Sequence, residues 1–125
     1  MLKWVVAAAA LVAVPFTASA QDAEAGAGVF KKCAACHQIG PDAKHGLGPS
    51  LTCIAGKTAG TQEGFAGYSP ALKDSGIVWD DDHLLKWFEK DDAVVKGNKM
   101  IFPAGIKNEE DRANLLAYIK SQCAQ

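Results

Sequence analysis

The chain has 125 residues, and its 13 basic and 14 acidic side chains give a formal net charge of −1. This near balance excludes the strongly basic surface on which nucleic-acid binding depends, so no nucleic-acid partner is expected. The length suits a single domain with a modest core of its own.

The first 20 residues have the pattern of a secretory signal peptide. The basic residue Lys3 precedes an apolar run over residues 4–16, and small residues at 18–20 precede the expected cleavage point. The apolar run is shorter than the roughly 20 residues that span a bilayer, and no second apolar stretch follows. We therefore expect residues 1–20 to be removed on export, which leaves one periplasmic domain over residues 21–125 that does not span the membrane.

The first predicted helix covers residues 22–35. Ala25, Val29 and Phe30 lie at helical spacing and predict one apolar face. Gly26 precedes Phe30 by one turn, so another stretch of backbone is expected to approach the helix closely at that point.

This helix leads into the sequence CAACH at residues 33–37. A C-x-x-C pair alone suits a dithiol oxidoreductase, half of a zinc site or a covalently held cofactor. The adjacent His37 turns the pair into the attachment signature of c-type haem, in which Cys33 and Cys36 form thioethers and the histidine ligates the iron. A redox dithiol requires a preceding strand and zinc requires a second close pair of ligands, and the sequence shows neither pattern. The motif therefore predicts one covalently bound haem c.

A glycine-rich stretch over residues 40–68 follows and has no periodic pattern, although it carries several large apolar side chains. So long a loop is uncommon in a compact domain unless something orders it, and a haem packed against it would do so. His45, within this loop, is predicted to be an exposed histidine.

Four more helical segments are predicted after the loop, and no alternating strand pattern is present. Ser69 and Pro70 are typical of a helix start, and Gly76 of a helix end. Acidic residues at 80–82 complement the N-terminus of the next helix, which also carries His83. The four segments span residues 69–76, 80–89, 91–95 and 108–122.

Met100 is the only methionine beyond the predicted signal peptide and is the candidate sixth ligand of the iron. Gly97, Pro103 and Gly105 around it indicate a shaped loop rather than a core helix. The alternatives are a methionine that fills the core, or a bis-histidine haem that uses His83.

These features together resemble the class I c-type cytochromes over the whole of residues 21–125, and among them the bacterial cytochromes c2. The resemblance implies an all-α cytochrome c fold, with five short helices and long loops wrapped around one haem. It is carried by CAACH at 33–37, GPSL at 48–51, GFAGYS at 64–69, Trp79, GNKM at 97–100, and Gly26 and Phe30 facing Leu115 and Tyr118 where the family's first and last helices cross.

The resemblance also implies roles for single residues. His37 and Met100 would be the axial ligands, and the carbonyl of Pro49 would accept a hydrogen bond from His37 that orients the ring and raises its basicity. The haem propionates would be hydrogen-bonded by Tyr68, Trp79 and Asn98.

Three residues depart from the family pattern. Lys57 stands where many relatives have an arginine near a propionate, and lysine keeps the charge but lacks the planar fork. Trp87 replaces a tyrosine whose hydroxyl reaches toward the methionine sulfur, which is expected to alter the haem potential. Pro103 is an insertion beside the Met100 loop.

Cys53 and Cys123 lie outside the family pattern. They are either two unrelated buried thiols or, as we expect in an oxidising compartment, a disulfide that joins the loop after GPSL to the last helix. In the chain-entropy model, closing so long a loop contributes roughly 3 to 5 kcal/mol to stability.

With both axial positions filled, the resemblance implies a monomeric electron carrier and not an enzyme. A membrane cytochrome bc complex would be the donor, and a photosynthetic reaction centre or a terminal oxidase would be the acceptor. Fast, weak docking of this kind depends on complementary charge. Five lysines flank the ligand segments and could supply this charge, namely Lys31, Lys32, Lys96, Lys99 and Lys107. The alternative is that they are ordinary solvated side chains.

Two other functions stay open at this point. A labile Met100 would give a haem protein that binds a diatomic ligand or acts on peroxide. An exported dithiol oxidoreductase would instead be colourless.

Overall fold

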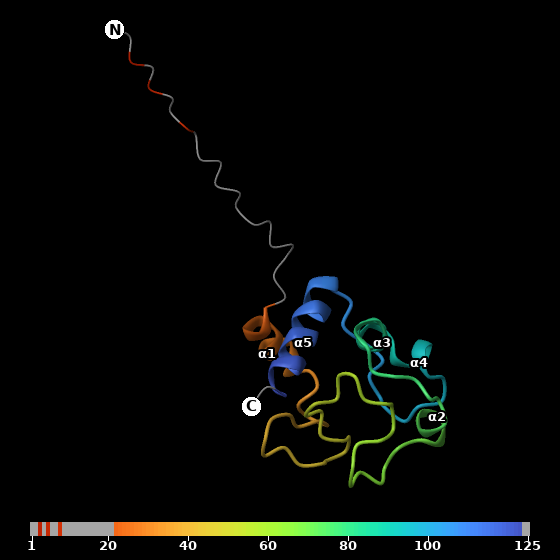
Figure 1. The fold of residues 1–125 in the computed structure, drawn as a ribbon. Helices are drawn as coiled ribbons and strands as arrows, with labels where there is room; N and C mark the ends of the chain where they lie inside the picture. Colours follow the sequence, from red (N-terminus) through yellow and green to blue (C-terminus); the bar gives the residue numbers. More distant parts are fainter. Residues whose placement is uncertain (1–2, 4, 6–7, 9–21, 124–125) are drawn as a thin grey trace.

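The computed structural model describes residues 3, 5, 8 and 22–123. The predicted signal peptide, residues 1–20, therefore lies almost entirely outside the described residues. Within the described residues the fold is all-α, as predicted, and contains no β-strand (Figure 1). The helices are α1 (Ala23–Phe30), α2 (Pro70–Lys73), α3 (Asp81–Glu89), α4 (Asp91–Val94) and α5 (Glu109–Ser121).

Side-chain caps set the starts of four helices. The carboxylate of Asp22 accepts hydrogen bonds from two backbone N–H groups of α1, and Asp80 accepts one from the first turn of α3. Ser69 and Asn108 cap α2 and α5 in the same way. These caps satisfy N–H groups that have no partner inside the helix, so the starts of these helices follow from local chemistry.

The first helix is shorter than the sequence pattern predicts. We expected a helix over residues 22–35, but α1 ends at Phe30 and turns follow as far as Cys36. The backbone N–H of Cys33 donates to the carbonyl of Phe30, and the N–H of Cys36 donates to that of Cys33. Such i→i−3 bonds tighten the chain relative to an α-helix, which explains why helical spacing in the sequence overestimates the length of α1.

The second helix is also shorter than predicted. It ends at Lys73 rather than near Gly76, because the N–H and the hydroxyl of Ser75 both donate to the carbonyl of Leu72 and close the turn early. The bounds of the other three helices agree with the prediction to within two residues, which is the usual uncertainty at helix ends.

Helices α1 and α5 cross in close contact on one side of the molecule (Figure 1). Gly26 is buried at the crossing, and the rings of Phe30 and Tyr118 pack with their centroids 5.4 Å apart. The backbone N–H of Asp22 also donates to the buried side chain of Asn114, at 2.9 Å. The predicted crossing of the first and last helices is present.

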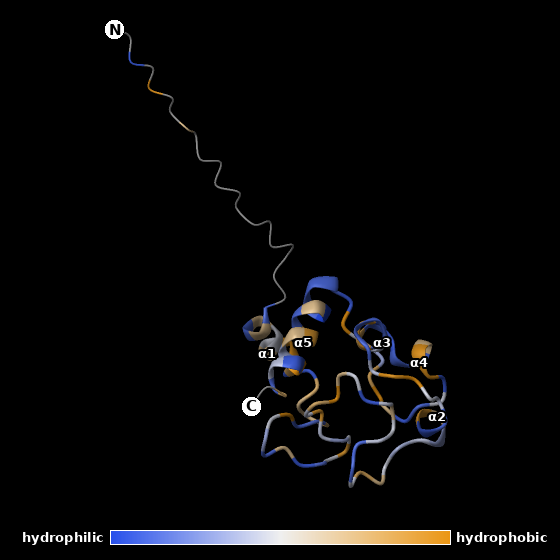
Figure 2. Ribbon diagram, in the orientation of Figure 1, coloured by the Kyte–Doolittle hydropathy of each residue, from blue (hydrophilic) through white to orange (hydrophobic). Residues whose placement is uncertain are grey.

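The core lies between α5, α3 and the loops below them. Ile106, Leu115 and Leu116 are fully buried, and Trp79 packs edge to face against Trp87 with ring centroids 5.0 Å apart. Figure 2 shows that α5 is hydrophilic at its first turn and hydrophobic in its middle, where it meets α1. None of the helices in the described part of the chain has the length and apolarity needed to cross a membrane.

Candidate haem-binding site

The two cysteines of CAACH lie in the turns that follow α1. The Cys33 side chain is half-buried and packs against the core, whereas Cys36 is exposed. Burial, with a smaller contribution from the charge of Cys36, raises the pKa of the Cys33 thiol to about 11. A catalytic dithiol needs a thiol pKa below its ordinary value, so this environment does not suit the oxidoreductase alternative.

The imidazole of His37 is fixed by the loop that follows it. Its Nδ1 lies 2.8 Å from the carbonyl oxygen of Pro49. A carbonyl only accepts, so Nδ1 carries the proton and Nε2 is left with its lone pair, as a metal ligand requires. Burial lowers the pKa of His37, and the hydrogen bond to Pro49 opposes that shift only in part, which favours the neutral ring.

Gly48 fits against the face of this imidazole. A Cβ at this position would lie 2.7 Å from Nδ1 of His37 and closer still to Cε1, so a larger residue would displace the ring. The hydrogen bond expected between Pro49 and His37 is present, and Gly48 explains how the loop comes close enough to make it.

The Met100 side chain is half-buried and packs against the core. Its backbone N–H donates to Oδ1 of Asn98 at 2.8 Å, and Nδ2 of Asn98 donates to the carbonyl of Val95 at 2.9 Å. Asn98 therefore shapes the loop that carries Met100. A hollow of about 390 Å³ beside this loop is lined in part by Asp91, Asn98 and Phe102.

A buried glutamine connects the residues predicted near the propionates. The N–H of Gln62 donates to the hydroxyl oxygen of Tyr68 at 3.1 Å, and Lys57 donates to Oε1 of Gln62 at 2.7 Å. Nε2 of Gln62 donates to the carbonyls of Ser50 and Thr52. The sequence gives no signal of this role for Gln62, because Gln62 lies in a loop without periodicity and its partners are up to 12 residues away along the chain.

Trp79 and Trp87 contact each other in the core, as described above, and both are buried. Trp79 also closes the loop that carries Lys57, because the N–H of Trp79 donates to the carbonyl of Lys57 at 2.8 Å. These two residues therefore belong to one packed unit, while His37 and Met100 are held by separate loops.

In the structure a disulfide joins Cys53 to Cys123, with their Cα atoms 4.7 Å apart. It ties the loop after GPSL to the turn that ends α5. Cys53 has φ of 57°, and it is the only non-glycine residue with positive φ among the described residues.

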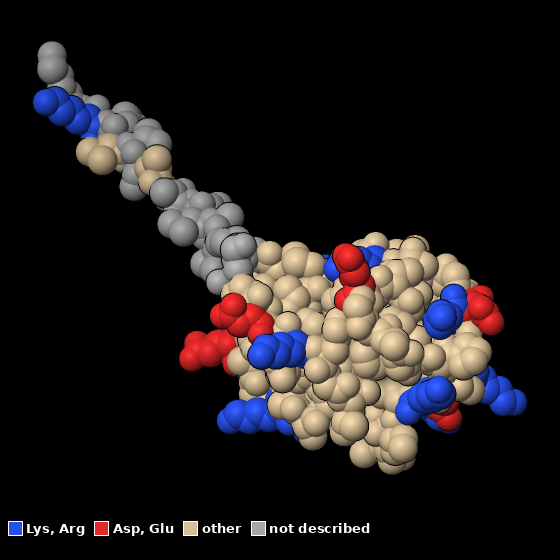
Figure 3. All heavy atoms as spheres, turned by 90° about the horizontal axis from the view of Figure 1, so that it is seen from below, with Lys and Arg blue, Asp and Glu red and all other residues tan. Residues whose placement is uncertain are grey.

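The five lysines predicted for docking are all exposed. They fall in three segments, namely the turns after α1, the loop around Asn98 and the approach to α5, where Lys107 donates to the carbonyl of Glu89 at 3.3 Å. Figure 3 shows, on one face of the molecule, both basic and acidic side chains spaced around a broad uncharged surface.

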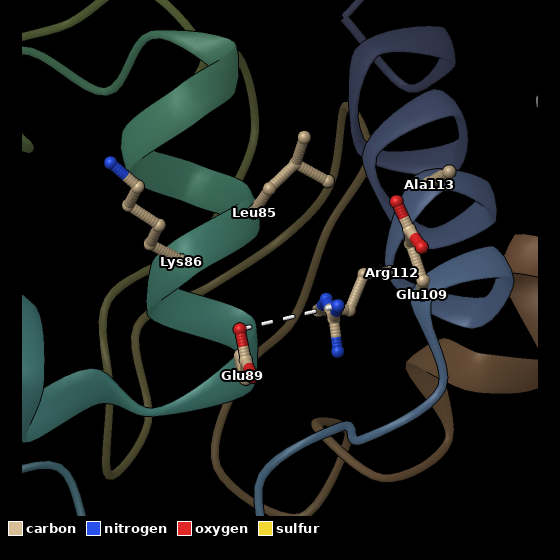
Figure 4. Close-up of a pocket in the computed structure, with 6 residues that line it drawn as sticks. All are labelled: Leu85, Lys86, Glu89, Glu109, Arg112 and Ala113. Carbon is tan, nitrogen blue, oxygen red and sulfur yellow. Dashed lines mark ion pairs between the residues drawn. The ribbon is translucent and has the colours of Figure 1, made fainter.

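A second groove, of about 230 Å³, lies between α3 and α5 and is separate from the predicted site (Figure 4). Arg112 borders it and donates to the carbonyls of Ile106 and Lys107, with Glu89 4.0 Å away. None of the predicted haem-binding residues lines this groove.

Comparison with known proteins decides the family. The family model for cytochrome c matches residues 23–122. The chain belongs to the cytochrome c family. It is 44% identical to the cytochrome c2 of Rhodomicrobium vannielii over 124 residues, which cover 99% of this chain and 98% of that one. It is 51% identical to the cytochrome c2 of Rhodoblastus acidophilus over 100 residues, or 80% of this chain and 92% of that one.

A solved structure supports the same conclusion. Cytochrome cH from Methylobacterium extorquens has a similar fold, with a TM-score of 0.74 and 40% identity, and the match covers 80% of this chain and 98% of that one. The prediction of a class I c-type cytochrome like cytochrome c2 is confirmed. Family membership makes the chain an electron carrier with one covalently bound haem c, and not an enzyme.

The residues present suit this cofactor. The possible donors are the thiols of Cys33 and Cys36 at attachment spacing, the imidazole of His37 and the half-buried thioether of Met100. Because Nδ1 of His37 is bonded to Pro49, its Nε2 is the nitrogen available to a metal. Within the described residues, no group of three or more His, Cys, Asp or Glu side chains is arranged to hold a metal ion by itself.

Proposed function

We propose that Cys33 and Cys36 hold the haem through thioethers and that His37 and Met100 are the axial ligands. The observation that carries this proposal is the hydrogen bond from Nδ1 of His37 to Pro49, because it orients the ring with Nε2 available. The bound haem supplies one-electron exchange between Fe(II) and Fe(III). The chain's own part is to fix the ligands, exclude water and set the potential.

Several neighbouring residues would serve the haem in this proposal. Tyr68, Trp79 and Asn98 would donate to the propionates, since buried carboxylates need donors. Lys57, which already contacts Gln62, would add positive charge nearby. Trp87 would lie near the Met100 sulfur in place of the usual tyrosine, with its ring held by the contact with Trp79.

We propose that the protein functions in the periplasm, to which the signal peptide at residues 1–20 directs its export. There the protein would act as a monomer that takes electrons from a membrane cytochrome bc complex and delivers them to a photosynthetic reaction centre or a terminal oxidase. The similarity to proteins named cytochrome c2, from Rhodomicrobium vannielii and Blastochloris viridis, supports this route.

Docking would depend on the exposed lysines beside the ligand segments. The test is the rate at which the reduced protein is oxidised by membranes that contain the acceptor, measured over a range of ionic strength. We expect the rate to fall as salt rises, and a Lys99→Gln variant to be slower than wild type at low salt. Lys86→Gln is the matched control, because Lys86 is paired with Asp82 on α3 and lies outside the docking set.

A rate that does not depend on ionic strength would rule out the docking role. Equal effects of the Lys99 and Lys86 variants would do the same. The competing function, a haem with a labile Met100 that binds diatomic ligands or acts on peroxide, is tested with carbon monoxide. Binding of carbon monoxide to the reduced native protein at neutral pH would favour that function over the carrier.

A further inference from the structure

The peptide group between Pro49 and Ser50 makes a hydrogen bond at each end. Its carbonyl oxygen accepts from Nδ1 of His37 at 2.8 Å, and its N–H donates to Nδ1 of His45 at 2.9 Å. The opposite nitrogen of His45, Nε2, lies 2.8 Å from the carbonyl oxygen of Glu63. Because Nδ1 of His45 accepts, its ring proton is on Nε2 and is donated to Glu63.

These three hydrogen bonds form one chain with a common direction. In each, the donor lies on the side of His37 and the acceptor lies farther away. Hydrogen bonds linked in this way through an amide and an imidazole polarise one another. Donation of the Ser50 N–H leaves more negative charge on the Pro49 carbonyl, and that makes the carbonyl a stronger acceptor for His37.

His45 is held in position for this contact. Its ring packs against Phe65 with centroids 5.5 Å apart, and a Cβ on Gly64 would lie 3.4 Å from Nε2. Ser50, whose N–H donates to His45, is buried. His45 itself is exposed, as the sequence predicted, yet both of its nitrogens are used, and that the sequence did not reveal.

We propose that His45 is a positioning residue that tunes the haem through the Pro49–Ser50 peptide. By accepting from Ser50 it strengthens the bond from His37 to Pro49, which increases electron density on the axial ligand, favours Fe(III) and lowers the reduction potential. This inference rests on the proposed ligation of the haem by His37.

Two substitutions separate this role from simple tethering of two loops. In His45→Asn the side chain keeps an acceptor at the position of Nδ1, next to Ser50, but no longer reaches Glu63. In His45→Gln it keeps a donor at the position of Nε2, next to Glu63, but loses the acceptor for Ser50. The pair thus removes one hydrogen bond at a time.

The experiment measures two properties of each holoprotein, the reduction potential and the hydrogen-exchange rate of the Ser50 amide. We expect His45→Gln to raise the potential and to speed exchange of the Ser50 amide at least tenfold. We expect His45→Asn to leave both near the wild-type values. The potential should follow the Ser50 bond, so a His45 variant that retains slow Ser50 exchange should retain the wild-type potential.

A potential that does not follow Ser50 exchange would overturn the inference. This includes a His45→Gln protein with fast exchange and an unchanged potential, and a His45→Asn protein with slow exchange and a shifted one. The proposed ligation is tested separately, by the spectrum of the wild-type protein alone. Absence of haem, or a sixth ligand other than methionine, would contradict the proposed function before any variant is compared.

Discussion

Gly26 on α1 lies directly against the backbone of α5, where a Cβ would overlap the carbonyl oxygen of Asn114 and come within 2.7 Å of Cβ of Tyr118. No rotamer relieves this overlap, because the obstacle is backbone. The crossing of the first and last helices therefore depends on the absence of a side chain at one position. This crossing holds in place the turn that carries CAACH.

We predict that Gly26→Ala lowers the free energy of unfolding by about 1–3 kcal/mol or more, the usual cost of overpacking a close contact. Gly28→Ala is the matched control on the same helix, because a Cβ there meets nothing within 4 Å. That control should raise stability by about 0.5–1 kcal/mol, since alanine is the better helix former. Denaturant unfolding followed by circular dichroism measures both, and equal effects would contradict the close contact.

Gln62 is predicted to stabilise the loop over residues 40–68. Replacing it by leucine removes the donors to the carbonyls of Ser50 and Thr52, and each buried group left without a partner costs about 1–3 kcal/mol. Gln38→Leu is the control, because Gln38 accepts one exposed hydrogen bond, from the N–H of Lys44, and its loss should change stability by less than about 0.5 kcal/mol. Thermal unfolding of the two variants should rank them in this order, and an unaffected Gln62→Leu protein would show that the loop is ordered by other contacts.

The link between Cys53 and Cys123 gives a third prediction. Replacing both by serine should lower the free energy of unfolding by roughly 3–5 kcal/mol, the chain-entropy value for so long a loop. Reductant should destabilise the wild-type protein to a similar extent and leave the double variant unchanged. Thiol titration of unfolded, unreduced holoprotein should find no free thiol, and two free thiols would rule out the bond.

Local chemistry made much of this fold predictable. The caps at Ser69 and Asn108 and the motif CAACH all act over a few residues, so their sequence patterns are sufficient to identify them. The contact of Gly26 with α5 was expected because the family resemblance supplied the partner helix.

The features that escaped prediction depend on distant partners or on turns. The end of α1 at Phe30 is set by i→i−3 bonds that apolar spacing does not register. Gln62 and His45 act on residues that are brought near by a loop without periodicity, so nothing in their immediate sequence signals their bonds. Composition and spacing record which residues are apolar, but they do not record which carbonyl a side chain will meet.

Ligation of the haem iron by both His37 and Met100 is tested most directly by the visible absorption spectrum of the mature protein. Spectra are recorded in both redox states and extended into the far red, where ferric haem with a methionine ligand has a weak band. We predict sharp c-type peaks on reduction and the far-red band on oxidation, with loss of that band in Met100→Ala. Haem peaks without the band in the wild-type protein, or no haem at all, would contradict ligation by both residues.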